Sequence, residues 1–173
     1  MTPAVTPERL SQLEERFRRH GLKFWLSAWL PVGLGIGIIL IESTTFMGAD
    51  HTSGPLRWLW ETLFGHVSNA RWDLIHLMAR KSGHFFGYGV IGLLWLRAWW
   101  MTLPHSNFPE DAFLSLLGTA LVASSDELHQ AYLPNRTGTP RDVLIDCCGA
   151  LTLQLAVYIF LRLFRPKQLA RED

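Results

Sequence analysis

The chain has 173 residues and a mass of 19.7 kDa, which suits one compact domain. Only 18% of the residues are charged, eight are Trp, and the mean hydropathy is positive at +0.13. So little charge cannot cover the surface of a soluble domain of this size. The formal net charge of +1 lacks the basic excess of a nucleic-acid-binding protein, and the adjacent Cys147 and Cys148 exclude a disulfide framework and a zinc ribbon. The composition therefore predicts an integral membrane protein that binds no nucleic acid.

The first 23 residues are mostly polar and charged, with no apolar stretch like that of a cleavable signal peptide. Acidic and basic side chains are mixed between residues 7 and 20, which predicts a solvent-exposed helix. We therefore expect residues 1–23 to form a charged cytoplasmic segment ahead of the first membrane span.

Four apolar stretches follow this segment. A helix needs about 20 mostly apolar residues to cross the hydrocarbon core of a bilayer. The stretches at about residues 24–41, 82–100 and 143–164 approach or reach this length. The stretch at 112–130 is free of charge only as far as residue 125, so it spans only if its polar end continues the helix. The sequence predicts an all-α membrane protein, a four-transmembrane-helix bundle formed by residues 24–164.

An amphipathic segment lies between the first two stretches. Its apolar residues recur at helical spacing, opposite Arg57 and Glu61. These apolar residues are Leu56, Leu59, Trp60, Leu63, Phe64 and Val67. A helix of about three turns is too short to cross a bilayer, so we expect it to lie flat on the outer membrane surface. The alternative is a lid packed over the bundle.

The distribution of basic residues predicts the orientation in the membrane. The N-terminal segment carries five Lys or Arg residues, and the C-terminal tail, residues 165–173, carries three. We therefore expect a multi-pass protein of the bacterial cytoplasmic membrane with both termini in the cytoplasm. The connections at residues 42–81 and 126–142 then face outward, although both also contain Arg residues.

Glycine pairs in the first two spans predict where helices pack closely. Gly33 and Gly37 form one G-x-x-x-G pair, and Gly83 and Gly87 form another. This spacing lets two helix backbones approach each other in lipid. We expect the first two spans to pack against each other through these glycines.

Polar residues interrupt the spans at places that the four-span topology brings to the same outer face, near Glu42 at the end of the first span. They open the second span, close the third, occupy the turn that follows and open the fourth. In chain order they are Lys81, His84, Tyr88, Asp126, Glu127, Gln130, Arg136, Asp142 and Asp146. Charged groups inside a membrane span are costly, so their convergence predicts a functional site.

The predicted cluster carries four carboxylates but only two permanent cations, Lys81 and Arg136. A buried excess of negative charge requires a proton, a cation or solvent. Three arrangements are open: a protonated His84 beside a carboxyl group that keeps its proton, a divalent cation held by oxygens, or acids that face water or cap a helix. Capping is an equal alternative for Asp142, because Asp is a preferred N-cap residue. The sequence assigns no metal ligands, and we expect no cofactor other than such a cation.

The residue types in the cluster predict their roles. The expected acid/base residues are His84, Asp126 and Glu127. The residues expected to bind a ligand are Lys81, Tyr88, Gln130, Arg136 and Asp142. We also expect Arg136 to fold back over the cluster and pair with Asp126, Glu127 or Asp142, because its planar fork can satisfy two carboxylate oxygens at once.

Four short motifs in this region resemble the VanZ-like family of small bacterial membrane proteins. They are residues 81–88 (KSGHFFGY), 126–130 (DELHQ), 134–136 (PNR) and 141–143 (RDV). The resemblance covers about residues 38–155, and the order and spacing of the four motifs make it specific. Asp146 departs from the family pattern, in which Asn is more usual at this position.

The resemblance implies a role in the cell envelope, since the founding member is associated with resistance to the glycopeptide teicoplanin. We expect the chain to recognise a polar or anionic headgroup at the outer face of the membrane. Its partner would be a membrane lipid or a lipid-linked envelope precursor. The alternative is an intramembrane enzyme that modifies such a lipid through a His/carboxylate pair, although the sequence contains neither a G-x-S-x-G nor an H-E-x-x-H motif.

Overall fold

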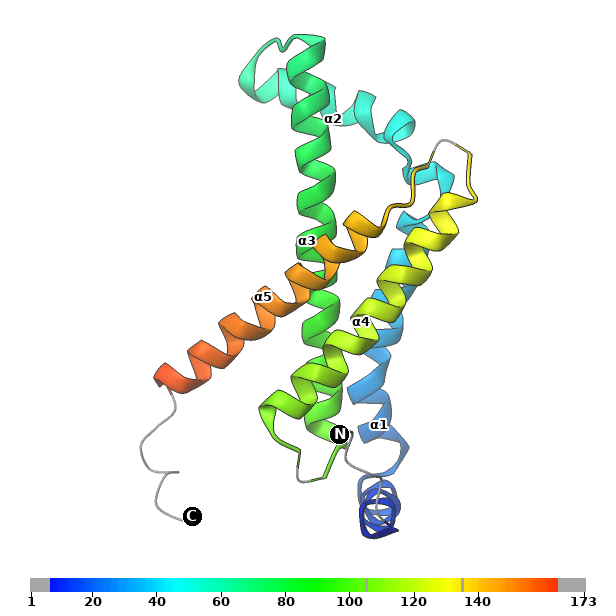
Figure 1. Ribbon diagram of the computed structural model, residues 1–173, viewed down its shortest axis with the longest axis vertical. Coiled ribbons are helices and arrows are strands. Elements are labelled where there is room, and N and C mark those ends of the chain that lie inside the picture. Colours follow the sequence, from blue (N-terminus) through cyan, green and yellow to red (C-terminus); the bar gives the residue numbers. More distant parts are fainter. Residues whose placement is uncertain (1–6, 105, 135, 165–173) are drawn as a thin grey trace.

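The computed structural model describes residues 7–104, 106–134 and 136–164, and over these residues the chain is helical without any strand. Its elements are α1 (Pro7–Glu42), the short 3-10 helix η1 (Thr45–Met47), α2 (Ala49–Phe64), α3 (Asn69–Thr102), α4 (Phe108–Ala131) and α5 (Pro140–Phe164). In Figure 1, α1, α3 and α4 run up and down alternately, and α5 crosses them obliquely. The all-α prediction is confirmed. The predicted basic tail at residues 165–173 lies outside the described residues.

Each of the four predicted stretches lies within one long helix. The segments Arg19–Glu42 of α1 and Pro140–Phe164 of α5 are long and apolar enough to cross a membrane. Helices α3 and α4 are long enough, at 34 and 24 residues, but they are not apolar enough by the same measure. Apolarity alone therefore identifies two candidate spans among the described residues, rather than the four predicted.

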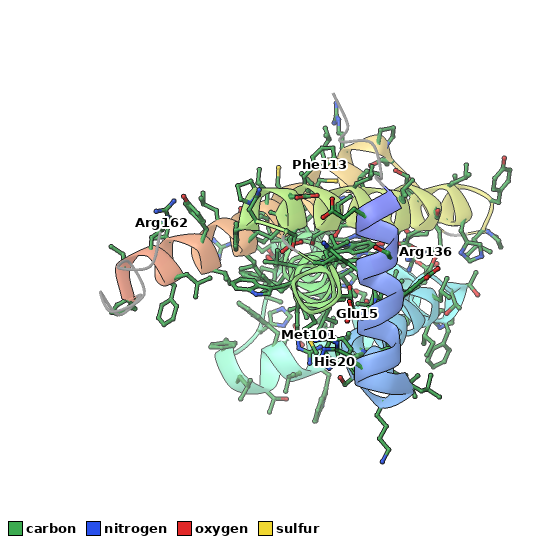
Figure 2. All side chains as sticks on the ribbon, turned by 90° about the horizontal axis from the view of Figure 1, so that it is seen from below. Glu15, His20, Met101, Phe113, Arg136 and Arg162 are labelled. Atoms are coloured by element: carbon green, nitrogen blue, oxygen red, sulfur yellow. The ribbon has the colours of Figure 1, made fainter. Side chains whose placement is uncertain are left out.

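A kink at Gly21 divides α1 into two parts. Gly21 has φ 65° and ψ 179°, a left-handed conformation that glycine adopts without steric cost. The charged residues before the kink form a separate helical segment, which is seen end-on at the bottom of Figure 1 and from the side in Figure 2. The apolar part of α1 begins after the kink, close to the predicted start of the first span.

Helix α3 lies at the centre of the molecule, as the view along its axis in Figure 2 shows. Its most extensive contact is with α5, where small residues let the backbones touch. A Cβ atom added to Gly149 would lie 1.9 Å from the carbonyl oxygen of Phe85, and one added to Gly92 would lie 2.7 Å from the Cβ of Ala150. The α3–α5 interface is therefore the tightest helix contact that the glycines of this chain make across the bundle.

The first two spans pack against each other as predicted, but the prediction that Gly33, Gly37, Gly83 and Gly87 make this contact is wrong. A Cβ atom added to Gly33, Gly37, Gly83 or Gly87 would have no atom from the described residues within 4 Å, beyond the local helix backbone. The G-x-x-x-G spacing thus marks open space in these helices.

In α4 the distribution of polar and apolar side chains is the reverse of that in a soluble bundle. The buried residues of α4 are polar or small: Asp111, Ser115, Thr119, Ala123, Asp126, Glu127 and Gln130. Its large apolar residues face outward, with Phe113 60% and Leu121 63% exposed. Buried polar groups bond across the bundle, since Gln154 on α5 donates to the hydroxyl of Ser115 at 2.8 Å.

Helix α2 begins earlier and ends earlier than the predicted amphipathic segment at residues 56–67. It spans Ala49–Phe64, so Val67 falls in the connection to α3, where it is buried. Near the start of the helix, the Thr52 hydroxyl and Nε2 of His76 on α3 lie 3.2 Å apart. Most of the apolar face is uncovered, with Leu63 64% and Phe64 70% exposed.

Candidate functional site

The predicted polar residues meet where α4 ends, α5 begins and α3 passes between α5 and α1 (Figure 1). The end of α1 joins this region through Ser43, whose hydroxyl lies 2.9 Å from Nδ1 of His129 on α4. The alternation of helix directions causes this convergence, as the sequence predicted. The individual partners differ in part from those expected.

Two pairs join α3 to the first turns of α5. Lys81 Nζ forms an ion pair with Asp142 Oδ1, and His84 Nδ1 lies 3.1 Å from Asp146 Oδ1. Asp146 is fully buried and Asp142 nearly so. Within the described residues, the carboxylate that holds His84 is therefore Asp146, which had no predicted role, rather than one of the two acids on α4.

A third pair joins α3 to α4. The Tyr88 hydroxyl donates to Asp126 Oδ2 at 2.9 Å, and both side chains are buried. Gln130, one turn later on α4, is also buried, with 3% of its surface exposed. Tyr88, Asp126 and Gln130 thus lie together, as the spacing on the two helices predicted.

The turn between α4 and α5 is fixed by backbone contacts. The backbone N–H of Thr139 donates to Glu127 Oε2 at 2.7 Å, and Gly138 lies so close that an added Cβ would be 1.9 Å from the Glu127 carbonyl oxygen. The Thr139 hydroxyl accepts the backbone N–H of Asp142 at 3.3 Å, which is the N-cap hydrogen bond of α5. Capping is therefore done by Thr139, and the Asp142 carboxylate is free to pair with Lys81.

Arg136 does not make the predicted ion pair. Its Nη1 donates to the backbone carbonyl of Met47 at 3.0 Å, and its Nε is buried without an acceptor among the described residues. Burial, together with the charge of Arg80, lowers the pKa of the Arg136 guanidinium from its usual value. Arginine still keeps its charge at neutral pH, so a half-buried cation whose buried Nε–H has no acceptor among the described residues remains here.

A cavity of about 800 Å³ lies between α1 and α3. Because the two helices are antiparallel, the polar end of α1 lies beside the polar start of α3. The cavity wall is therefore polar at one end and apolar at the other. The apolar end includes Pro31, Leu34, Ile38, Val90, Ile91 and Leu94. The polar end includes Glu42, Arg80, His84, Tyr88, Asp126 and Arg136.

The cavity also opens sideways. Leu34 and Ile38 on α1 are 61% and 58% exposed, and Val90 on α3 is 52% exposed, although all three line the cavity. Gly83 and Gly87 line it as well, and their lack of side chains helps to keep it open. A molecule in the surrounding medium can therefore enter the cavity from the side of the bundle.

The cavity divides the predicted site into two layers. His84, Tyr88, Asp126, Gln130 and Arg136 line its wall. By contrast, Lys81, Glu127 and Asp142 are absent from the part of the wall that the structure describes. Of these three residues, Lys81 and Asp142 pair with each other, and Glu127 accepts a hydrogen bond from the Thr139 backbone.

Arg80 is a lining residue that the sequence reasoning missed. It is half-buried, and no ion pair or hydrogen bond of its side chain occurs among the described residues. A signal was present, because Arg80 lies one helical turn before His84 and so shares its face.

The model of the VanZ/LLP1 family matches residues 29–162 of the chain. The chain belongs to the VanZ/LLP1 family. The matched region contains the whole polar cluster and every residue that lines the cavity, so both lie within the part of this chain that matches the family. No curated protein and no solved structure matches this chain.

Proposed function

We propose that this VanZ/LLP1-family protein binds an amphiphile with an anionic headgroup in the cavity between α1 and α3. The observation that carries the proposal is the polarity of the cavity, which is apolar at one end and reaches Arg80 and Arg136 at the other. Its volume of about 800 Å³ lies in the usual range for small-molecule sites. An acyl or prenyl chain suits the apolar end, and a phosphate suits the two guanidinium groups.

The two arginines favour an anion over a neutral polar group. The positive charge of Arg80 acts on Arg136, and Arg136 Nε is buried without an acceptor. Two nearby cations repel each other, and a buried donor without a partner costs free energy. An oxyanion between them removes both penalties. A lipid-linked envelope precursor bound in this way would connect the site to teicoplanin-type resistance.

The protein is, in this proposal, a four-span protein of the bacterial cytoplasmic membrane with both termini in the cytoplasm. The exposed apolar surface and buried polar interior of α4 support a lipid environment for this helix also. At the opposite end from the polar cluster, Trp29 packs against Trp95 and Trp99 with ring centroids 5.6 and 4.7 Å apart. Tryptophan is enriched at membrane boundaries, and the excess of basic residues near the N-terminus supports a cytoplasmic position for this end.

The orientation is tested by labelling single cysteines in a chain whose Cys147 and Cys148 are replaced by Ala. Thr137→Cys, in the exposed turn before α5, should react in intact cells with a thiol reagent that cannot cross the membrane. Pro109→Cys, exposed at the start of α4, should react only after the membrane is opened. The reverse pattern would place the polar cluster on the cytoplasmic side and contradict the outer-face proposal.

Binding is tested by native mass spectrometry of the full chain with phosphatidylglycerol or phosphatidylethanolamine of identical acyl chains. We expect preferential retention of phosphatidylglycerol, and at least about tenfold weaker retention in the variant with Arg80→Gln and Arg136→Gln, because charged hydrogen bonds contribute about 1.5–3 kcal/mol each. Arg141→Gln is the matched control, since Arg141 is exposed in the first turn of α5. Equal retention of the two lipids, or an equal loss with Arg141→Gln, would refute the headgroup assignment.

A second candidate function is an intramembrane enzyme that modifies the bound lipid. The hydrogen-bonding contact between His84 and Asp146 favours it, because a carboxylate fixes the tautomer and orientation of a catalytic imidazole. His84 also lines the cavity. The same spectra distinguish the candidates, since a lipid product of changed mass that disappears with His84→Gln supports an enzyme, and recovery of unchanged lipid supports binding alone.

A further inference from the structure

Three side chains from three helices direct metal-binding atoms toward one point. One ligand atom each from His84 on α3, Glu127 on α4 and Asp146 on α5 lies within 4.8 Å of the other two. Around an ion bound at about 2.1 Å, tetrahedral ligand atoms are separated by about 3.4 Å. Small side-chain rotations therefore suffice to close the three groups around an ion.

Asp146, Glu127 and Asp126 each have one carboxylate oxygen that makes a polar contact and one that makes none among the described residues. Asp146 Oδ1 contacts His84, Glu127 Oε2 accepts a hydrogen bond from the backbone of Thr139, and Asp126 Oδ2 accepts one from Tyr88. The second oxygens, Asp146 Oδ2, Glu127 Oε1 and Asp126 Oδ1, are buried without a hydrogen-bond partner among the described residues.

These free oxygens belong to side chains that are more than nine-tenths buried, since Asp146 is 0%, Glu127 5% and Asp126 7% exposed. A buried carboxylate oxygen without a donor is costly, and a bound cation can satisfy several of them at once. The hydrogen bonds from Thr139 and Tyr88 fix the orientation of Glu127 and Asp126 in advance, as the outer-shell partners of metal ligands do.

Among the described residues, no nearby Lys or Arg side chain forms an ion pair with Asp126, Glu127 or Asp146. Lys81 pairs with Asp142, and Arg136 donates to the backbone carbonyl of Met47. Three carboxylates and one imidazole therefore remain at the junction of α3, α4 and α5 without a paired Lys or Arg among the described residues. A divalent ion supplies the missing positive charge.

We propose that His84, Glu127 and Asp146 bind a divalent transition-metal ion, Mn²⁺ or Zn²⁺, with Asp126 beside it. A mixed set of imidazole nitrogen and carboxylate oxygen suits these ions, whereas Mg²⁺ and Ca²⁺ prefer oxygen ligands alone. Coordination replaces the contact between His84 Nδ1 and Asp146 Oδ1. Because His84 and Asp126 also line the cavity, the ion faces a ligand there. The metal site does not depend on the headgroup proposal, since the ion binds in the absence of lipid.

The test uses the full chain without a polyhistidine tag, freed of metal with a chelator and titrated with MnCl₂ or ZnCl₂. We expect about one tightly bound ion per chain for at least one of the two metals and a rise in the melting temperature on binding. Asp146→Asn and Glu127→Gln should each weaken binding at least about tenfold. Asp111→Asn is the matched control, because Asp111 is equally buried on α4 but lies at its opposite end.

A spectroscopic readout identifies the nitrogen ligand. Bound Mn²⁺ should show electron spin-echo modulation from an imidazole nitrogen, which His84→Gln removes and His76→Gln, at the other His of α3, does not. The proposal is overturned if the unmodified chain binds neither ion stoichiometrically, if both carboxylate variants bind as tightly as the parent, or if Asp111→Asn loses as much affinity. Failure of lipid binding with intact metal binding would leave this site in place and refute only the headgroup proposal.

Discussion

The two sides of α3 differ in how they meet their neighbours. Toward α5, Gly92 and Gly149 bring helix backbones into direct contact. Toward α1, Gly83 and Gly87 face a cavity of about 800 Å³. Both sides carry glycines at helical spacing, yet one side is closed and the other is open. Small residues therefore indicate where a helix lacks bulk, and only the neighbouring helix decides whether that space is filled.

The two sides of α3 also have different roles at the candidate site. The closed side holds α5 in register, so that Asp142 and Asp146 reach Lys81 and His84. The open side gives a ligand access to His84 without disturbing that register. A binding or catalytic site requires side chains held in fixed positions and a cavity that is open to the ligand.

The largest expected effect is a loss of stability when the contact between α3 and α5 is disrupted. Gly149→Val should prevent correct packing of α5, because even the first carbon of the new side chain would lie 1.9 Å from the backbone oxygen of Phe85. Overpacking usually costs about 1–3 kcal/mol, and a clash with backbone costs more because the helix must move as a whole. We expect the melting temperature of the purified chain to fall by roughly 10 °C or more, or the folded protein to be lost.

The same substitution on the open side should have the smallest effect on stability. A Cβ at Gly87 meets no atom from another part of the described chain within 4 Å, so Gly87→Val should change the melting temperature by less than roughly 3 °C. If both variants are equally destabilised, α3 does not have one closed and one open side. If Gly149→Val melts like the parent, the α3–α5 contact is not as tight as described.

The sequence predicted the helices and the meeting of the polar residues correctly. Both follow from run length and from the alternation of helix directions, which bring the start of α5 and the end of α4 beside α3. The sequence could not predict that Tyr88 pairs with Asp126 rather than with the neighbouring Glu127. The rotation of a helix about its axis decides which of two adjacent acids faces a given neighbour.

The conformation of residues 136–139 and the cavity could not be predicted from the sequence. Whether Arg136 pairs with an acid depends on the path of a turn that is fixed by the packing of Gly138 on the backbone of Glu127. Likewise, the cavity arises from the separation of two helices, which no residue pattern encodes directly. Arg80 could have been found from its spacing to His84.

Photo-crosslinking tests the central claim, that the cavity holds an anionic amphiphile, most directly. Full-length protein in vesicles is irradiated with phosphatidylglycerol that carries a diazirine on one acyl chain, and the adducts are mapped by mass spectrometry. We predict adducts mainly at Leu34, Ile38 and Val90, loss of these adducts with excess unlabelled phosphatidylglycerol, and their absence in Gly87→Leu. Equal labelling of Leu151 and Leu155, which are exposed on α5 away from the cavity, with no effect of competitor or of Gly87→Leu, would contradict the account.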